Sequence, residues 1–366
     1  MGIFILILCI IFYYCAIFLL TKYTLQAFSI NKYKKGVFIA SMLIFSIPMF
    51  CIIDYIWRGN AFVEAFVIPG YLITAFLIYY LMTIFCIIFI RFLWNKTKKK
   101  STIWLDKLSI FSAAGISILI CCIGIACAQI PEYSRHSFEF GLTKEMKIVV
   151  VSDMHYGSTG SMLSLKSMVD HINQEEPDAV FLVGDVFDNA VGNVNHQEFV
   201  EQMNQLKSTY GTFAVTGNHE FMQNDLNQIK GFYEGTNIRL LLDEEITLND
   251  ELRLVGRIDH RVPRKPLTEI VSDSKLPLIV LDHQPQYYRE ATEVQAKLQI
   301  SGHTHNGQIF PGNLLIYLMN RILYNSPTNG IHSYEDFSLA ITRGYGTWGF
   351  PMRLTGASQI MVFSLK

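Results

Sequence analysis

The chain has 366 residues, of which 51% are hydrophobic, and its formal net charge at pH 7 is -1. A charge so close to zero gives neither the basic surface of a nucleic-acid-binding protein nor an acidic tail, so no nucleic-acid partner is expected. The apolar excess lies before Pro131, which predicts a membrane region over residues 1–130 followed by a soluble part.

Four apolar runs precede Pro131, and each approaches or exceeds the roughly 20 residues that a membrane-spanning helix needs. They cover residues 3–20, 37–57, 65–90 and 108–130. Burial in a large soluble core is the alternative, but four successive runs with charged breaks disfavour it. The first run lacks the basic start and the cleavage site of a signal peptide, so we expect a retained span. Pro48 and Pro69 lie inside the second and third spans, where a kink is tolerable because neighbouring helices can satisfy the freed carbonyls.

The short loops between these runs differ in positive charge, which predicts the orientation of the protein. The first loop carries Lys22, Lys32, Lys34 and Lys35, and the third carries Arg91, Lys96, Lys98, Lys99 and Lys100, whereas the second has only Arg58. Loops one and three are therefore expected in the cytoplasm of a cell with a plasma or inner membrane. The N-terminus and all residues after 130 are expected on the extracytoplasmic side. The spans show no spaced polar pattern, which favours an anchor over a transporter.

Residues 131–146 are expected to form a linker, and residues 147–366 a domain of alternating strands and helices. Strands are predicted at 147–151, 179–183, 211–215 and 238–242, with helices beginning near Ser161, Gln197 and Asp225. Further strands are predicted at 252–255, 278–281, 298–301, 339–342 and 359–365. This order is typical of an α/β domain in which two sheets pack between helices. All seven cysteines lie between residues 9 and 127, so this domain has no disulfide framework and no cysteine-ligated metal.

Polar residues follow five of these strands directly. They are Asp153 and His155, Asp185 and Asp188, Asn218 and His219, His283, and the pair His303 and His305. Any one of them has an ordinary explanation, such as a helix cap, a turn residue or a core histidine. Because ligands bind outside the carboxyl ends of strands in α/β sheets, the whole set predicts one site at one sheet edge. Imidazole and carboxylate ligands suit manganese, iron or zinc.

The blocks D-x-H, G-D-x-x-D, G-N-H-[DE], H and G-H-x-H occur in full and in this order, and the sequence resembles the calcineurin-like metallophosphoesterases from residue 147 to 366. Residues 302–308 and 343–346 resemble a membrane-associated branch related to bacterial UDP-2,3-diacylglucosamine pyrophosphatase-like enzymes. The resemblance implies a metallophosphoesterase-type αββα sandwich of two mixed sheets. An all-α transmembrane region of four helices would precede it.

Carried over by position, the resemblance implies two divalent metal ions, with manganese expected first and iron or zinc as alternatives. The first ion would be held by Asp153, His155 and His305, the second by Asn218, His283 and His303, and Asp185 would bridge them. Two such ions supply a nucleophile by lowering the pKa of water and stabilise the developing charge. His219 matches the position of a general acid or transition-state stabiliser close to the scissile phosphate, and Asp188 the carboxylate that orients it.

Three stretches depart from the family pattern or extend it. Asn189-Ala190 stands where many relatives have an arginine, and Arg343 is a candidate replacement for binding phosphate, with a surface role as the alternative. Asn306 stands where the most similar relatives usually have glycine. Residues 310–319 are apolar, and they are expected either to pack in the core or to border the active site and contact the bilayer.

The expected function is hydrolysis of a phosphoester or pyrophosphate bond by a membrane-anchored enzyme. A lipid-linked or nucleotide-sugar substrate of the cell envelope is preferred, and phosphomonoesters or cyclic nucleotides come second. The alternative from another class is a catalytically inactive membrane signalling or scaffold protein that keeps the fold. The complete set of candidate ligands argues against it.

Overall fold

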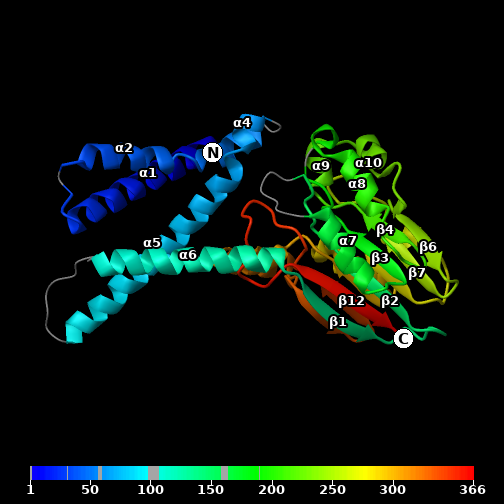
Figure 1. Cartoon of the computed structure of the whole chain (residues 1–366). Coiled ribbons are helices and arrows are strands. Elements are labelled where there is room, and N and C mark those ends of the chain that lie inside the picture. Colours follow the sequence, from blue (N-terminus) through cyan, green and yellow to red (C-terminus); the bar gives the residue numbers. More distant parts are fainter. Residues whose placement is uncertain (1, 31, 57–59, 98–106, 158–163, 189) are drawn as a thin grey trace. The chain divides into compact units, whose positions relative to one another are not determined.

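The computed structural model describes residues 2–30, 32–56, 60–97, 107–157, 164–188 and 190–366. The chain divides into two compact units, residues 1–123 and residues 124–366 (Figure 1). The boundary falls inside one helix, α6 (Lys107–Gln129), so the last residues of that helix belong with the second unit.

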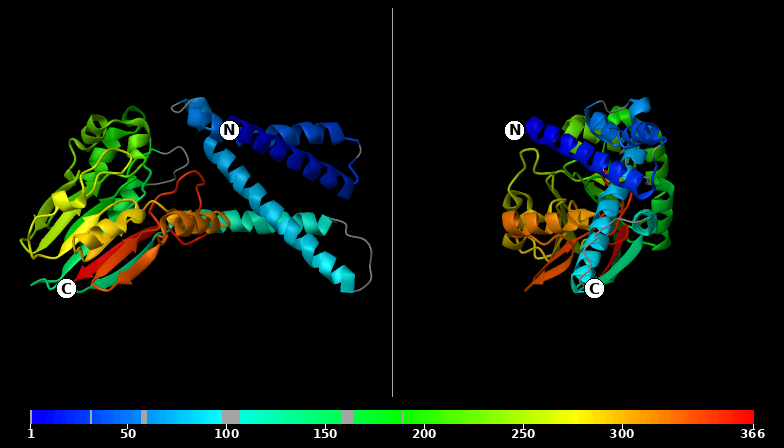
Figure 2. Two further views of the ribbon diagram at one scale, coloured as in Figure 1. Left: turned by 180° about the vertical axis from the view of Figure 1, so that it is seen from behind. Right: turned by 90° about the vertical axis from the view of Figure 1, so that its left-hand side faces the viewer.

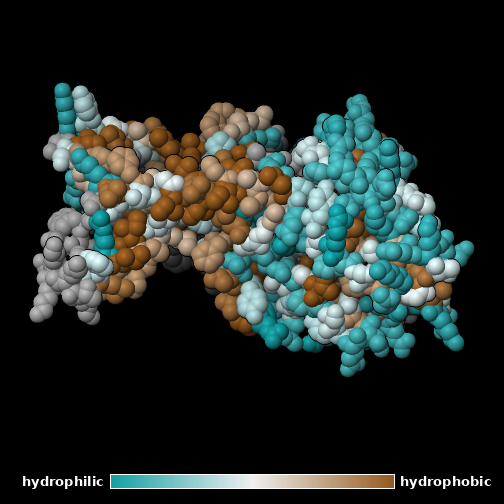
Figure 3. All heavy atoms as spheres, turned by 60° about the horizontal axis from the view of Figure 1, so that its bottom comes forward, coloured by the Kyte–Doolittle hydropathy of each residue, from teal (hydrophilic) through white to brown (hydrophobic). Residues whose placement is uncertain are grey.

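The described residues of the first unit form helices joined by turns and short loops. Its helices are α1 (Gly2–Ala27), α2 (Lys34–Ile44), α3 (Met49–Ile56), α4 (Ala61–Glu64), α5 (Val67–Thr97) and the first part of α6 (Lys107–Gln129). Within the described residues, three segments are long and apolar enough to cross a membrane: Lys34–Asp54, Ala61–Trp94 and Lys107–Gln129. Figure 3 shows the apolar residues gathered over these helices, whereas the second unit is mainly hydrophilic on the same face.

These three segments correspond to the second, third and fourth expected spans. The first expected span lies in α1, where the side chains of residues 2–9 and 12 are outside those that the structure describes. Arg58 and Lys98–Lys100, on which the predicted orientation partly depends, also fall outside the described residues.

Each of the two prolines lies beside an interruption of its candidate span. At Pro48 the second span is interrupted by turns between α2 and α3, where the amides of Ser46 and Ile47 bond to carbonyls three residues back. Pro69 falls in the first turn of α5, where a missing backbone N–H breaks no helical hydrogen bond. The candidate span Ala61–Trp94 is interrupted just before Pro69, by turns at residues 65–66 that separate α4 from α5.

The second unit contains two six-stranded sheets among its described residues. One has the order β1 (Glu132–Phe138), β12 (Gln359–Leu365), β2 (Met146–Val151), β3 (Ala179–Val183), β4 (Thr212–Val215), β5 (Ile238–Leu240). The other has the order β10 (Gly330–Tyr334), β11 (Phe337–Ile341), β9 (Leu298–Ser301), β8 (Leu278–Leu281), β7 (Leu252–Gly256), β6 (Glu244–Leu248). Both sheets are mixed. In the first, β2–β5 run parallel and β12 pairs antiparallel with β2. In the second, β7, β8, β9 and β11 run parallel, whereas β6 and β10 each pair antiparallel with a neighbour.

The core explains this architecture. Fully buried side chains of both sheets, such as Phe181 and Ile279, pack in one cluster between them. The outer face of the first sheet is covered by α7 (Leu165–Gln174), α8 (His196–Met203) and α10 (Leu226–Tyr233). The outer face of the second sheet is covered by α11 (Leu267–Ile270) and α12 (Tyr288–Glu293). The expected αββα sandwich of two mixed sheets is confirmed.

Local sequence signals set the ends of the helices over the first sheet. Ser164 accepts a hydrogen bond from the amide of Ser167 (3.2 Å) and caps α7, whereas the expected cap, Ser161, lies outside the described residues. Asp225 and Gln228 form a reciprocal capping box at the start of α10.

Three strands were not expected from the sequence, and all three lie at sheet edges. Residues 132–138, expected as part of a linker, form β1, which pairs with β12 from Glu132 with Gln359 to Phe138 with Leu365. β6 and β10 are the two edges of the second sheet. An edge strand has no neighbour on one side and keeps polar side chains, so the polar sequence of β1 lacks the apolar run by which inner strands are recognised.

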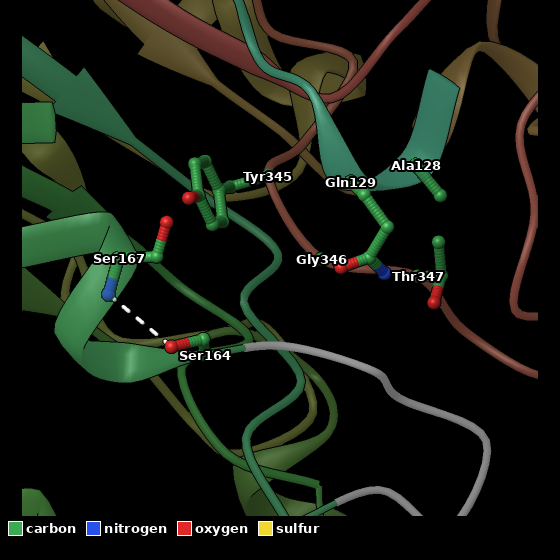
Figure 4. Close-up of a pocket in the computed structure, with 7 residues that line it drawn as sticks. All are labelled: Ala128, Gln129, Ser164, Ser167, Tyr345, Gly346 and Thr347. Atoms are coloured by element: carbon green, nitrogen blue, oxygen red, sulfur yellow. Dashed lines mark hydrogen bonds between the residues drawn. The ribbon is translucent and has the colours of Figure 1, made fainter. Parts of the chain in front are cut away.

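The second unit holds the last residues of α6 firmly. The amides of Arg353 and Ser358 donate to the carbonyls of Gly124 (2.8 Å) and Cys127 (2.9 Å), and the Ser358 hydroxyl donates to Ala128 O (2.8 Å). Ala128 and Gln129 also line a small polar cavity of about 30 Å³ with residues 345–347 and the start of α7 (Figure 4). Hydrogen bonds from the loop between β11 and β12 therefore attach the end of a candidate span to the two-sheet domain.

Candidate functional site

The polar residues that follow β2, β3, β4, β8 and β9 converge. Among the described residues, three groups have candidate ligand atoms within 4.8 Å of one another: Asp153, His155 and His305; Asp185, His283 and His303; His155, Asp185 and His219. Asp185 shares one group with His283 and another with His155. The sequence prediction of a single cluster at one sheet edge agrees with this geometry.

Two histidines of the first group face each other. The Nε2 atoms of His155 and His305 lie 2.9 Å apart, and His305 Nε2 is 3.4 Å from Asp153 Oδ1. Burial, with His155 and Arg353 nearby, holds the pKa of His305 well below its usual value. A neutral imidazole keeps a lone pair, so this arrangement suits a cation placed between the donors.

The second group contains a histidine whose ring is already oriented. His283 Nδ1 donates to the carbonyl of Val183 (2.8 Å), which leaves Nε2 directed at Asp185 Oδ2 (3.0 Å). Such a bond from the other ring nitrogen is common in metal-binding histidines. Burial lowers the pKa of His283, but the carboxylate of Asp185 outweighs this and raises it well above the usual value. Burial and the neighbouring His283 lower the pKa of His303 to about 4.

The side chain of Asn218 has a buried polar atom that the described residues of the protein leave unpaired. Its Oδ1 is buried and has no hydrogen-bond partner in the described part of the chain. Leaving a buried amide oxygen unpaired is unfavourable by about 1–3 kcal/mol. A cation at the cluster would satisfy this oxygen, so the donor set present fits a divalent metal ion.

The backbone at the cluster is strained and closely packed. Asp153, His155, Asp185, His303 and His305 all have positive φ, between 48° and 73°, although such residues avoid this region. A Cβ on Gly217 would lie 2.2 Å from Asp185 Oδ1, and one on Gly302 would lie 2.3 Å from Asp153 Oδ2. The glycines of the motifs are therefore required because a side chain there would displace a candidate ligand.

His219 and Asp188 form a hydrogen-bonded pair beside the cluster, through His219 Nδ1 and Asp188 Oδ1. The amide of His219 also donates to Asp185 Oδ1 (2.8 Å). Burial lowers the pKa of His219, but Asp185 and the bond to Asp188 raise it to about 9. Although burial raises the pKa of Asp188, its bonds with His155 and His219 bring it well below the usual value. The pair therefore holds a proton at neutral pH.

Glu220 is a functional residue to which sequence reasoning assigned no role. Its buried carboxylate accepts from the amides of Asp185 (3.2 Å), Val186 (2.5 Å), Phe187 (3.4 Å) and Gly217 (2.8 Å). It thereby ties the loop after β3 to the loop after β4. The acidic position of G-N-H-[DE] was the available signal for it.

Arg353 was also missed, and Arg343 forms an ion pair. Arg343 donates to Glu132 Oε2 (2.7 Å) at the start of β1, and its phosphate contact stays a prediction. Arg353 is fully buried, and its Nη2 donates to His305 Nδ1 (3.2 Å) and to Gly346 O (2.5 Å). No sequence motif marks Arg353. Trp348 contributes an edge-on ring 5.7 Å from that of His219.

Asn306, the other departure, is accommodated locally. It adopts a left-handed conformation with φ of 50°, which asparagine tolerates better than most residues. Its Nδ2 donates to Thr355 O (2.7 Å). The substitution of glycine by asparagine thus keeps the turn beside His305 and adds a contact to the loop between β11 and β12.

Comparison of the sequence with known proteins finds similarity to metallophosphoesterases. Residues 146–307 match the family model described as Calcineurin-like phosphoesterase. An uncharacterized metallophosphoesterase of Helicobacter pylori (strain ATCC 700392 / 26695) is 34% identical over 236 residues, covering 61% of this chain and 60% of that protein. A transmembrane protein with metallophosphoesterase domain of Danio rerio is 29% identical over 242 residues, covering 60% and 53%. An uncharacterized metallophosphoesterase of Aquifex aeolicus is 28% identical over 247 residues, covering 65% and 92%. This chain thus spans only part of the length of the first two relatives.

Replacing Glu220 by alanine should disrupt the cluster while leaving the side chain of every candidate ligand unchanged. Four backbone amides would lose their acceptor, which we expect to destabilise the unit by about 1–3 kcal/mol and to lower its metal content. Thermal unfolding in detergent and elemental analysis measure both effects. Glu293→Ala, at an exposed position of α12, is the control. Equal melting temperature and metal content in the two variants would contradict the role of Glu220.

Proposed function

We propose that this protein is a membrane-anchored, two-metal hydrolase. The proposal starts from the match of residues 146–307 to the calcineurin-like phosphoesterase family model. Its reaction is cleavage of a phosphoester or pyrophosphate bond in a lipid-linked or nucleotide-sugar substrate of the cell envelope. The observation that carries the proposal is the convergence of the candidate ligands into groups that share Asp185.

The metal assignment follows these groups. One ion is assigned to Asp153, His155 and His305, the other to Asn218, His283 and His303, and Asp185 lies where it would contact both. Carboxylate, amide and imidazole donors together suit manganese, which we propose first, and iron or zinc. Ions bound there would lower the pKa of a water molecule and neutralise charge on the phosphate.

His219 is assigned as the proton donor to the leaving oxygen. Its raised pKa keeps it protonated at neutral pH, as a general acid requires, and Asp188 fixes the ring through Nδ1. Nε2 is then the atom that delivers the proton. The neighbouring ring of Trp348, which is 53% exposed, offers an apolar face to the leaving group.

A substrate at the membrane surface is favoured by the loop between β11 and β12. Its Tyr345 and Gly346 amides donate to Ser152 O and Asp153 O (both 2.9 Å), and Arg353 contacts His305. The same loop is bonded to the last residues of α6. One segment therefore links the candidate ligands to the end of a candidate span, which supports a lipid-linked phosphate over soluble phosphomonoesters or cyclic nucleotides.

The orientation is also a proposal. Lys22, Lys34 and Lys35 line one cavity of about 620 Å³ in the first unit. Clustered lysines favour the cytoplasmic side, and an odd number of further crossings would put the domain outside the cytoplasm. An inactive signalling or scaffold protein remains the second candidate function, which the complete donor set disfavours.

Removal of metal should abolish hydrolysis of a chromogenic phosphodiester, and manganese should restore it. Because His283 holds a proton in the metal-free protein, metal binding must release that proton, so affinity should rise as the pH rises. Calorimetry in buffers of different ionisation enthalpy measures the proton release. Metal content near two ions without turnover of any phosphoester, lipid phosphate or nucleotide sugar would favour the scaffold function instead.

Replacing His219 by alanine should lower kcat by roughly 10²–10⁴-fold for substrates with poor leaving groups. The rate should fall as the pH rises through the pKa of His219, since the acid then loses its proton. Asp188→Asn removes a partner that raises this pKa, so the alkaline limb of its pH–rate profile should move to lower pH. An unchanged limb in Asp188→Asn, or wild-type kcat in His219→Ala, would refute the assignment.

A further inference from the structure

The helical segment that follows the last histidine motif leaves its apolar side chains uncovered. It comprises α13 (Gly312–Met319) and η4 (Asn320–Tyr324), drawn in orange in Figure 2. All residues of α13 are described, and none of them is buried. Eight large side chains are between 44% and 75% exposed: Leu314, Leu315, Tyr317, Leu318, Met319, Ile322, Leu323 and Tyr324. The expectation of core packing is therefore wrong, and a contiguous apolar surface of this kind indicates a binding partner.

The segment is held firmly to the candidate metal site. Gly307 adopts a φ of +68°, and a Cβ there would lie 2.3 Å from Asn313 Cα, so the start of α13 packs directly on the turn after His305. The amides of Asn313 and Leu314 donate to Ile309 O (3.1 Å) and Pro311 O (3.0 Å). At the far end, the Thr304 hydroxyl donates to Thr328 O. Both ends of the segment that contains α13 and η4 are thus held beside His303 and His305.

The charge of this stretch fits a lipid surface. Residues 306–334 contain no aspartate or glutamate, and Arg321 is their only arginine or lysine. Aliphatic side chains suit the acyl region, tyrosines suit the interface, and an arginine suits phosphate headgroups. At about 1.5 Å per residue the helix is roughly 20 Å long, too short to cross a bilayer. It is long enough to lie in the interface.

The end of a candidate span belongs to this unit. Residues 124–129 of the second unit are the end of the candidate span Lys107–Gln129, and hydrogen bonds to Arg353 and Ser358 fix them to the domain. Residues 130 and 131 alone separate this helix from β1. If Lys107–Gln129 crosses a bilayer, the chain enters β1 within two residues of the end of that span.

We propose that α13 and η4 lie in the surface of the bilayer and hold the loop of His303 and His305 against it. The domain would then have a membrane contact of its own besides the spans. This membrane contact requires that the chain is anchored in a bilayer, and it does not require that the candidate metal site hydrolyses a phosphate. Its consequence, direct entry of a lipid-linked phosphate, rests on the proposed function.

The contact is tested in the full chain with its seven cysteines replaced by serine. Leu315→Cys, Leu318→Cys and Ile322→Cys are labelled with an environment-sensitive nitrobenzoxadiazole dye and reconstituted in phosphatidylethanolamine–phosphatidylglycerol nanodiscs. Asp336→Cys, exposed in the turn between β10 and β11, is the matched control. Dyes on the helix should emit at shorter wavelength and be quenched several-fold more by doxyl-labelled lipid than the dye at position 336. Quenching equal to that control would overturn the proposal.

Two further outcomes are informative. A blue shift without doxyl quenching would show the helix buried against protein, for example a second copy, and would also overturn the proposal. With the native cysteines, Leu315→Asp/Leu318→Asp should raise KM several-fold for a lipid phosphate in vesicles and leave a soluble phosphodiester unchanged. Equal loss of both activities would contradict a membrane role. A chain that hydrolyses neither substrate still reports insertion through quenching, so failure of the proposed function is distinguished from failure of this contact.

Discussion

The structure depends on one electrostatic constraint, which is the burial of several carboxylates and imidazoles within a few ångströms of one another. Asp153 and Asp185 are buried and share neighbours, and the Nε2 atoms of His155 and His305 face each other at 2.9 Å. Buried charge is stable only when it is paired or coordinates a metal. The unpaired oxygen of Asn218 adds to the same demand. A pair of divalent cations is the ligand that this combination of donors suits.

The surrounding fold maintains that arrangement. Left-handed backbone at Asp153, Asp185 and His305 is unfavourable, and it is held by glycines that allow close approach and by Glu220, which gathers the amides of two loops. The loop between β11 and β12 packs behind the cluster and bonds to the end of α6. Residues 124–129, the end of a candidate span, and the site therefore belong to the same unit, which supports the proposal of a substrate at the membrane surface.

Much of this was predictable because apolar inner strands and the polar residues after them are strong local signals. The strands from β2 to β12 that lie inside the sheets were found, and the residues after five of them converge as expected. The polar edge strand β1 was taken for a linker, since nothing local distinguishes Glu132–Phe138 from a loop. Arg353 could not be found, because its contact with His305 joins segments 48 residues apart. Arg343 stood in a suggestive motif, yet its pairing with Glu132 depends on the unexpected strand.

The central claim is that two cations occupy this cluster with Asp185 between them. Anomalous diffraction from manganese-loaded crystals of the full chain measures this directly. We expect two peaks about 3.5–4 Å apart. One should lie beside Asp153, His155 and His305 and the other beside Asn218, His283 and His303, with Asp185 contacting both. A single peak, or peaks remote from Asp185, would contradict it.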